Sequence, residues 1–235
     1  MNTQTNTYDL RRGQLRNYFD RTAVEAWSRL TSDAPVGRIR ATVRAGRERM
    51  RATLLGWLPT DLHGVRILDA GCGTGAFAAA AALRGAEVVA IDVAPTLVEL
   101  GRTRQPRDLS TGSLTFLVGD MLDPSLGNFD YVVAMDSLIH YDAPDMLGAL
   151  SSLGERTGTA LLFTFAPRTP ALSVMHTVGR LFPRAERAPA IEPVSELRLR
   201  RGLREQAGLE DWRTARTERI ASGFYTSQAM ELVLK

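Results

Sequence analysis

Residues 65–75 read VRILDAGCGTG, and this stretch decides the fold. Apolar residues lead into Asp69, and glycines follow at positions 71, 73 and 75. An alanine-rich stretch, Ala76–Leu83, comes next. This order predicts a buried parallel strand, a tight turn and then a helix. Glycine allows positive φ in such a turn and lets backbone N–H groups approach a ligand at the helix N-terminus. The stretch therefore predicts a binding site.

Two acidic residues indicate which ligand this site takes. The glycine spacing is G-x-G-x-G, one position shorter than the G-x-G-x-x-G fingerprint of dinucleotide sites. Asp69, which precedes the glycines, would repel a pyrophosphate but would pair with an ammonium group. Asp92 ends the next apolar run, where an acid accepts hydrogen bonds from ribose hydroxyls. An ammonium group, a ribose and no phosphate describe S-adenosylmethionine (SAM). NAD binding, or a non-catalytic nucleotide-binding module, is the alternative from another class of protein.

The stretches ILDAGCGTG and VVAIDVA resemble motifs I and II of the class I SAM-dependent methyltransferases. A first set of residues is thereby assigned to the cofactor: Asp69, Gly71, Cys72, Gly73, Gly75, Asp92 and Val93. We interpret Cys72 as a small residue in a tight turn rather than as a nucleophile, because no histidine is placed beside it.

Further candidates for the cofactor site lie at the next strand ends and in the N-terminal segment. Asp120, after Val118 and Gly119, would accept from the adenine amino group, and Met121 would lie on the adenine ring; a solvated turn is the alternative. Met135, after the fourth predicted strand, joins the set. Arg47, in GRERMR, would pair with the methionine carboxylate of SAM. A solvated face is the alternative for an arginine in so basic a segment.

Composition sets the broad class. The chain has 235 residues, 44% of them hydrophobic, which suits one α/β domain with additions. Its 29 basic residues are all arginine except Lys235, and the net charge of +3 is too small and scattered to predict nucleic-acid binding. The longest apolar run, Ala76–Leu83, is far short of the ~20 residues that span a bilayer. The first residues, MNTQTNTYDLRR, show no signal peptide. With a single cysteine no internal disulfide is possible, and we expect a cytoplasmic protein.

The sequence predicts an α/β fold, Rossmann-like and of the class I methyltransferase type, with a mostly parallel seven-stranded sheet. Residues 1–60 are helical in pattern and are expected to form a lid over the open end of the sheet. Residues 61–166 alternate strands and helices and are expected to form the SAM-binding core. Residues 167–194 are expected to form an inserted flap after the fifth strand. Residues 195–235 would complete the sheet with a helix and two strands.

The flap has three interpretations. Its prolines frame a short apolar helix over residues 171–182, flanked by Arg168, Arg180, Arg184 and Arg187. This helix would pack on the core, cover a large flat apolar substrate with acidic groups, or lie on a membrane surface. The proline frame favours a substrate cover.

The loop after the fourth strand holds the candidate substrate-side residues. The strand and loop read FDYVVAMDSLIHY, residues 129–141. The end of this strand faces the SAM methyl group in this fold, so Asp136, Ser137 and Tyr141 are expected to bind substrate. His140 suits a proton or hydrogen-bond role near neutral pH, against the alternative of a histidine that packs the loop.

In the lid, Tyr18 stands beside Phe19, and its polar tip is expected to reach the active site. Phe19 itself is expected to pack on the core. His63 and His176 have no cluster of ligands around them, and no metal-ligand spacing occurs in the chain. No protein-bound metal is predicted.

Several stretches together resemble the magnesium-protoporphyrin O-methyltransferases of chlorophyll and bacteriochlorophyll synthesis. They span nearly the whole chain: NYFDRTAVEAWSRLT, VRAGRERMRATLL, ILDAGCGTG, FLVGDMLDP, FDYVVAMDSLIHY, LFPR and SGFYTS. The resemblance implies methyl transfer from SAM to a propionate of Mg-protoporphyrin IX, with Tyr18 and His140 as catalytic residues. The products would be the monomethyl ester and S-adenosylhomocysteine (SAH), and Mg²⁺ would belong to the substrate. The implied partner is the large porphyrin-binding subunit of magnesium chelatase, with contact to the photosynthetic membrane.

The expected chemistry agrees with the residues present. A propionate has a pKa of ~4.3, like that of Glu, and is already ionised at neutral pH. Its methylation therefore needs alignment of oxygen, methyl carbon and sulfur more than it needs a base. The alternative is another small-molecule O-methyltransferase, acting on a quinone or a phenol, in which His140 would serve as the base.

Overall fold

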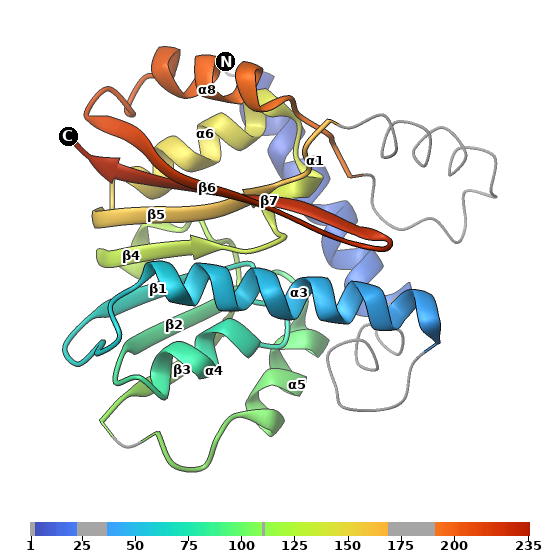
Figure 1. The fold of residues 1–235 in the computed structure, drawn as a ribbon, viewed down its shortest axis with the longest axis vertical. Helices are drawn as coiled ribbons and strands as arrows, with labels where there is room; N and C mark the ends of the chain where they lie inside the picture. The colour runs from blue at the N-terminus through green and yellow to red at the C-terminus, as the bar shows by residue number, and fades with distance from the viewer. Residues whose placement is uncertain (1–2, 23–36, 110, 169–190) are drawn as a thin grey trace.

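A seven-stranded sheet forms the centre of the fold (Figure 1). The computed structural model describes residues 3–22, 37–109, 111–168 and 191–235. The strands are β1 (Arg66–Ala70), β2 (Glu87–Asp92), β3 (Ser113–Val118), β4 (Phe129–Ala134), β5 (Thr157–Phe165), β6 (Trp212–Ser222) and β7 (Tyr225–Leu234). Their order is β3-β2-β1-β4-β5-β7-β6, and β7 runs antiparallel to both of its neighbours while the other pairs are parallel. The predicted mostly parallel sheet of seven strands is confirmed.

Helices cover both faces of the sheet (Figure 1). One face carries α3 (Arg38–Trp57), α4 (Ala76–Ala82) and α5 (Pro95–Arg104), and the other carries α1 (Thr3–Asn17), α6 (Ala143–Gly154) and α8 (Glu196–Glu205). Short turns of helix are η1 (Tyr18–Thr22), η2 (Pro124–Leu126) and η3 (Leu138–His140). Helices α1 and α3, which both come from the segment predicted to form the lid, lie on opposite faces of the sheet. Within the described residues, no helix has the length and apolar character to cross a bilayer.

The central strands are apolar toward both faces, as a sheet covered by helices on both sides requires. In β1, the side chains of Ile67 and Leu68 are fully buried. Ile67 packs in the cluster that includes α3 and α4, and Leu68 in the cluster that includes α6 and α8. Val133 and Val132 of β4 divide between the two clusters in the same way. The alternation of side chains along a strand thus splits the core into two layers.

Parallel pairing brings the carboxyl ends of four strands to one edge of the sheet. Ala70 of β1 pairs with Ile91 of β2, and Asp92 pairs with Val118 of β3. The loops that follow β1, β2, β3 and β4 therefore gather at this edge, where open α/β sheets bind their ligands.

A side chain from the N-terminal segment caps α5. Ala94 is the N-cap residue of α5 and has no side chain that can cap. The Asp20 carboxylate of η1 instead accepts a hydrogen bond from the Thr96 N–H, at 3.1 Å, and another from the Thr96 hydroxyl. A carboxylate at this position satisfies a free N–H group and interacts favourably with the helix dipole. The contact ties η1 to the core.

The two ends of the predicted flap are fixed to each other. Pro167 and Val194 form a parallel bridge, and the Arg168 N–H donates to the Val194 carbonyl at 3.1 Å. The Glu192 N–H donates to the Ile139 carbonyl at 2.8 Å, which holds the base of the flap against the loop after β4. The helix expected over residues 171–182 lies outside the described residues, as do its flanking arginines Arg180, Arg184 and Arg187. Residues 23–36 of the expected lid also lie outside them.

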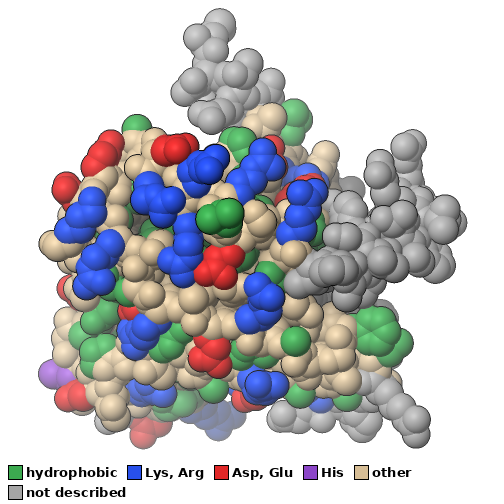
Figure 2. Space-filling view, turned by 45° about the horizontal axis from the view of Figure 1, so that its top comes forward, with side chains coloured by type: hydrophobic (Ala, Val, Ile, Leu, Met, Phe, Trp, Pro, Cys, Tyr) green, Lys and Arg blue, Asp and Glu red, His purple; other side chains and the backbone are tan. Residues whose placement is uncertain are grey.

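Charged side chains cover the exposed edge of the sheet. β6 is the last strand in the order, and Arg213, Glu218 and Arg219 on it are exposed. Figure 2 shows Lys and Arg side chains, with acidic ones among them, over the face that carries α8 and β6. Charges on an edge strand oppose its pairing with another chain.

Candidate active site

The glycine turn after β1 is fastened to the end of β2. The N–H groups of Gly71 and Cys72 donate to the Ile91 carbonyl at 2.9 and 3.0 Å. A Cβ atom on Gly71 would lie 2.3 Å from the Cβ of Ser137. Three glycines of the turn have positive φ, of +79°, +56° and +72°: Gly71, Gly73 and Gly75. Glycine is needed here both for the left-handed conformation and for the close approach of the loop after β4.

The two acids predicted to hold the cofactor lie at different depths. Asp69 is 2% exposed and accepts a hydrogen bond from the Ala78 N–H at 3.2 Å. Burial raises the pKa of Asp69 to about 7. Asp92 lines a cavity and accepts from the N–H groups of Gly73, at 2.8 Å, and Ala94, at 2.9 Å. Burial raises the pKa of Asp92 too. Asp69 thus lies beneath the turn, whereas Asp92 is part of the cavity wall.

The end of β3 is joined to α1. The Tyr8 hydroxyl donates to the Asp120 carboxylate at 2.8 Å, and Arg12 forms an ion pair with the same group. The Tyr8 ring stacks on the ring of Tyr141, and burial raises the pKa of both phenols. Both rings line the cavity, as does Met121. Asp120, which the sequence assigns to the adenine amino group, is held by protein donors and does not line the cavity.

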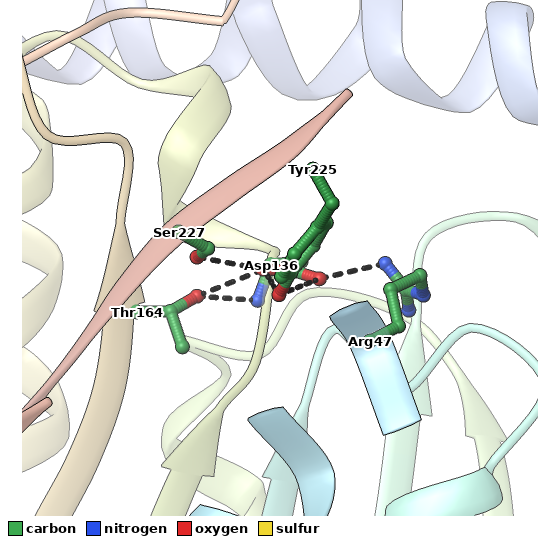
Figure 3. Close-up of polar contacts among 5 residues, drawn as sticks. All are labelled: Arg47, Asp136, Thr164, Tyr225 and Ser227. Carbon is green, nitrogen blue, oxygen red and sulfur yellow. Dashed lines mark hydrogen bonds and ion pairs between the residues drawn. The ribbon is translucent and has the colours of Figure 1, made fainter. Parts of the chain in front are cut away.

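Four side chains converge on Asp136 in the loop after β4 (Figure 3). Its carboxylate pairs with Arg47 at 2.7 Å and accepts from the hydroxyls of Tyr225, Ser227 and Thr164 at 3.1, 3.1 and 3.2 Å. The Asp136 side chain is 4% exposed. These contacts join α3, β5 and β7 to the loop that carries the predicted substrate residues.

The two predicted catalytic residues adjoin the same ring. His140, on η3, lines the cavity and lies 5.9 Å from the ring of Phe19, at 63°. Tyr18 makes an edge contact with Phe19 at 5.2 Å, and burial raises the pKa of Tyr18. The structure therefore brings both residues to one aromatic cluster but places only His140 of the two on the cavity wall.

One cavity collects most of the predicted residues. Those that line it are Arg47, Gly71, Cys72, Gly73, Asp92, Val93, Met121, Met135, Asp136, Ser137, His140 and Tyr141. The predicted residues that do not line it are Tyr18, Asp69, Gly75 and Asp120. Gly75 serves packing, because a Cβ atom there would lie 2.4 Å from the ring of Phe116.

Sequence reasoning missed two groups of residues. Tyr8 and Leu15 line the cavity, although α1 is mostly polar and has no motif that distinguishes them. Tyr225 and Ser227 hold Asp136, and both belong to the SGFYTS stretch that carries part of the family resemblance. That stretch was the available signal for these two hydroxyls.

The wall fits the SAM that the sequence predicts. Asp92 offers a carboxylate to a ribose, and Arg47 offers a guanidinium suited to a carboxylate. The Ser137 hydroxyl is buried and, among the residues that the structure describes, has no hydrogen-bond partner. Leaving such a group unpaired costs free energy, so a polar ligand atom is expected beside it. The stacked rings of Tyr8 and Tyr141 add a flat apolar surface suited to a base.

Comparisons with known proteins agree on one family. The model described as "Magnesium-protoporphyrin IX methyltransferase C-terminus" matches residues 134–234, and a general methyltransferase domain matches residues 67–156. A magnesium-protoporphyrin O-methyltransferase of Rhodobacter capsulatus is 47% identical over 221 residues, which cover 94% of this chain and 95% of that one. The crystal structure of magnesium protoporphyrin IX methyltransferase from Synechocystis PCC 6803 with bound SAH matches with a TM-score of 0.83 and 28% identity, covering 95% and 99% of the chains.

Similarity to methyltransferases of quinones is partial. A ubiquinone biosynthesis O-methyltransferase of Xanthomonas oryzae is 34% identical over 130 residues, which cover 53% of this chain and 54% of that one.

Proposed function

The chain belongs to the magnesium-protoporphyrin O-methyltransferase family, and we propose that it transfers the methyl group of SAM to a propionate carboxylate of Mg-protoporphyrin IX. The products are the monomethyl ester and SAH. One observation carries the proposal on the structural side: a single cavity wall contains the glycine turn, Asp92 and His140. The quinone alternative is disfavoured, because its relatives match about half of the chain whereas the porphyrin relative matches nearly all of it.

In this proposal several residues of the cavity wall hold SAM. Asp92 accepts hydrogen bonds from the ribose hydroxyls, and the N–H groups of Gly73 on Oδ2 and of Ala94 on Oδ1 keep the carboxylate in place. Met121 and Tyr141 flank the adenine. Arg47 takes the methionine carboxylate. Asp69, beneath the turn, acts on the ammonium group through its charge rather than by contact.

The reaction requires alignment of the reacting atoms and exclusion of water from them. Bound SAM supplies a methyl group on a sulfonium sulfur, which keeps the bonding electron pair as the ester bond forms. The chain has no proton to move, because a propionate of pKa ~4.3 is ionised near neutral pH. His140 donates a hydrogen bond that holds the carboxylate in line with the methyl carbon. Phe19 lies against His140, and with Tyr18 it excludes water from the reacting atoms.

The flap and η1 are proposed to hold the porphyrin between them. The base of the flap is bonded at Glu192 to Ile139, the residue before His140. The Glu192 carboxylate also pairs with Arg11 of α1 at 2.9 Å. The ends of residues 167–194 therefore lie beside the catalytic loop, which supports a role for this segment as the substrate cover.

Two contacts outside the active site are also proposed. Mg-protoporphyrin IX is large and mostly apolar, so direct transfer from a porphyrin-binding subunit of magnesium chelatase would spare it from water. Peripheral contact with the photosynthetic membrane would serve the same purpose. Both proposals rest on the family resemblance and on the nature of the substrate.

The test is a methyltransferase assay with SAM and Mg-protoporphyrin IX, read by mass for the monomethyl ester and by chromatography for SAH. Calorimetry with SAH and with NAD checks the cofactor class in the same preparation. Metal-free protoporphyrin and a quinol serve as competing acceptors. We expect the ester and SAH in equal amounts. Binding of NAD but not SAH, or faster methylation of the quinol, would refute the proposal.

A further inference from the structure

The Asp136 carboxylate is fully engaged by the protein. Its Oδ2 atom meets Nη1 of Arg47 at 2.7 Å and the Tyr225 hydroxyl at 3.1 Å. Its Oδ1 atom meets the hydroxyls of Tyr225 and Ser227 at 3.1 Å each and that of Thr164 at 3.2 Å. A carboxylate has about four lone-pair sites in all. Asp136 therefore has no acceptor site left for a substrate, although the sequence assigns it to substrate binding.

The backbone of Asp136 is held in an unusual conformation. Among the residues that the structure describes, Asp136 is the one non-glycine residue with positive φ, at +54°. Its N–H donates to the Thr164 hydroxyl at 2.7 Å, and this bond fixes the turn. Backbone conformations of this kind persist where the surroundings determine them, and they are common at functional sites. The turn is thus a built feature rather than a loop free to relax.

Arg47 is positioned from its backbone as well as from its guanidinium. The preceding residue, Gly46, faces β7 so closely that a Cβ atom there would lie 2.3 Å from Cδ1 of Tyr225. The Tyr225 ring thereby sets how closely α3 lies to β7. The Tyr225 hydroxyl donates to the Asp136 carboxylate that pairs with Arg47. The Arg47 side chain is 24% exposed and lines the cavity. Both ends of this side chain are therefore set by β7.

We propose that Asp136 is a positioning residue, which holds the Arg47 guanidinium for the methionine carboxylate of SAM, and that Tyr225 and Ser227 make β7 part of the cofactor site. A guanidinium has five N–H donors in a planar fork, so it can hold Asp136 and a ligand carboxylate at once. With one carboxylate fixed, the fork has a single orientation when the ligand arrives. This inference rests on the proposed function, because it needs a ligand with an amino-acid end.

Two ligands separate this role from a general effect on the fold. SAH carries the α-carboxylate, whereas 5′-methylthioadenosine has the same adenosine and sulfur without the amino-acid group. Tyr225→Phe keeps the net charge and the ring against Gly46 but removes the hydroxyl from Asp136. We expect it to weaken SAH binding about tenfold, the loss typical of a hydrogen bond to a charged group. The affinity for 5′-methylthioadenosine should stay within about twofold in this comparison.

Further variants test whether the loss of SAH affinity acts through Arg47. Ser227→Ala should act like Tyr225→Phe, and Arg47→Met should abolish the preference for SAH over 5′-methylthioadenosine. Adding Tyr225→Phe to Arg47→Met should then cost no further SAH affinity, because both changes act through one guanidinium. Tyr131→Phe, on β4 and off the cavity wall, is the control and should leave both affinities unchanged. In turnover, Tyr225→Phe should raise the KM for SAM more than it lowers kcat.

The measurements are isothermal titrations of each variant with both ligands. Equal loss for the two ligands in Tyr225→Phe, or no loss for either, would overturn the positioning role. So would a double variant that loses SAH affinity beyond Arg47→Met. Wild-type protein that binds neither ligand would instead refute the proposed function. The two failures are therefore distinguishable.

Discussion

The ring of Tyr8 lies on the ring of Tyr141, with 4.9 Å between the centroids and 18° between the planes. The Tyr8 hydroxyl at the same time donates to Asp120 at the end of β3. Through this pair, a helix from the N-terminal segment forms one wall of the cavity that also contains the glycine turn. We therefore expect α1 to contribute to cofactor binding, and not only to cover the substrate.

Variants of Tyr8 separate the stack from the hydrogen bond. Tyr8→Phe keeps the stacked ring and loses the bond to Asp120, whereas Tyr8→Ala loses both. A stacked aromatic pair contributes about 0.5–1.5 kcal/mol beyond its buried area. We expect Tyr8→Ala to weaken SAH binding several-fold more than Tyr8→Phe, measured by calorimetry. Equal affinities in the two variants would show that the stack plays no part.

Asp69 makes stability depend on pH. Its pKa is about 7 in the folded chain, against an ordinary value of 3.8 for an aspartate, so between these two pH values the folded state holds a proton that the unfolded state has released. Stability from this group therefore falls as pH rises from about 4 to 7, by at most about 1.4 kcal/mol per pH unit. Asp69→Asn removes the titration and keeps an acceptor for Ala78. The Tm of this variant relative to wild type should rise between pH 5 and pH 8. A difference in Tm that is the same at both pH values would contradict the assignment.

Cys72 is expected to react slowly despite its place on the cavity wall. Burial raises the pKa of its thiol, and the nearby Asp69 and Asp92 raise it further. The thiolate is the reactive form. We expect alkylation by iodoacetamide at pH 8 to be at least about tenfold slower than in protein unfolded by guanidinium. SAH should slow it again. As the chain has one cysteine, intact mass gives the rate directly. Fast labelling in the presence of saturating SAH would count against the proposed cofactor position.

His140 and Tyr18 should affect the chemical step rather than SAM binding. His140→Ala removes the proposed hydrogen bond to the carboxylate, and we expect kcat to fall by about 10²-fold or more while the affinity for SAH stays the same. Tyr18→Phe keeps the edge contact with Phe19, so its loss should be smaller. Single-turnover kinetics with Mg-protoporphyrin IX measure the rate of the chemical step in both variants. The assignment would be abandoned if both variants kept full turnover.

Asp20 is expected to stabilise the core from outside it. Asp20→Ala leaves the first turn of α5 without its carboxylate cap, which should cost about 1 kcal/mol in the free energy of unfolding. Denaturant unfolding measures this loss. Glu99→Ala is the control on the same helix, because Glu99 makes an exposed ion pair with Arg102, of a kind that contributes little. A loss in Asp20→Ala no greater than in the control would show that the cap is dispensable.

Local sequence patterns were enough to predict the sheet and most of the cavity wall. The signals are local: strand periodicity, the glycines and Asp92 can each be recognised within a short stretch of sequence. Parallel pairing then brings the strand ends together. The same patterns do not show how deeply a side chain is buried or which groups bind it. Asp69 and Asp120 both stand at strand ends, yet one lies beneath the turn and the other is held by Tyr8 and Arg12 of α1. Which donors reach a carboxylate depends on helices that join it from distant parts of the chain.

The hydroxyls around Asp136 illustrate the same limit. Tyr225 lies 89 residues after Asp136, and its hydroxyl reaches the Asp136 carboxylate because β7 inserts antiparallel between β5 and β6. Periodicity predicts that β7 is a strand but does not predict its place in the order. Only the resemblance drew attention to SGFYTS, and it gave those residues no role.

The bridge between Pro167 and Val194 has a consequence for engineering this protein. Because Arg168 bonds to Val194 and Glu192 bonds to Ile139, the chain enters and leaves the flap at one pinned point. We therefore expect that residues 169–190 can be exchanged for a segment of another length or character without moving β5 or α8. On the proposal that this segment covers the substrate, its replacement alone is a route to methylation of other tetrapyrrole carboxylates.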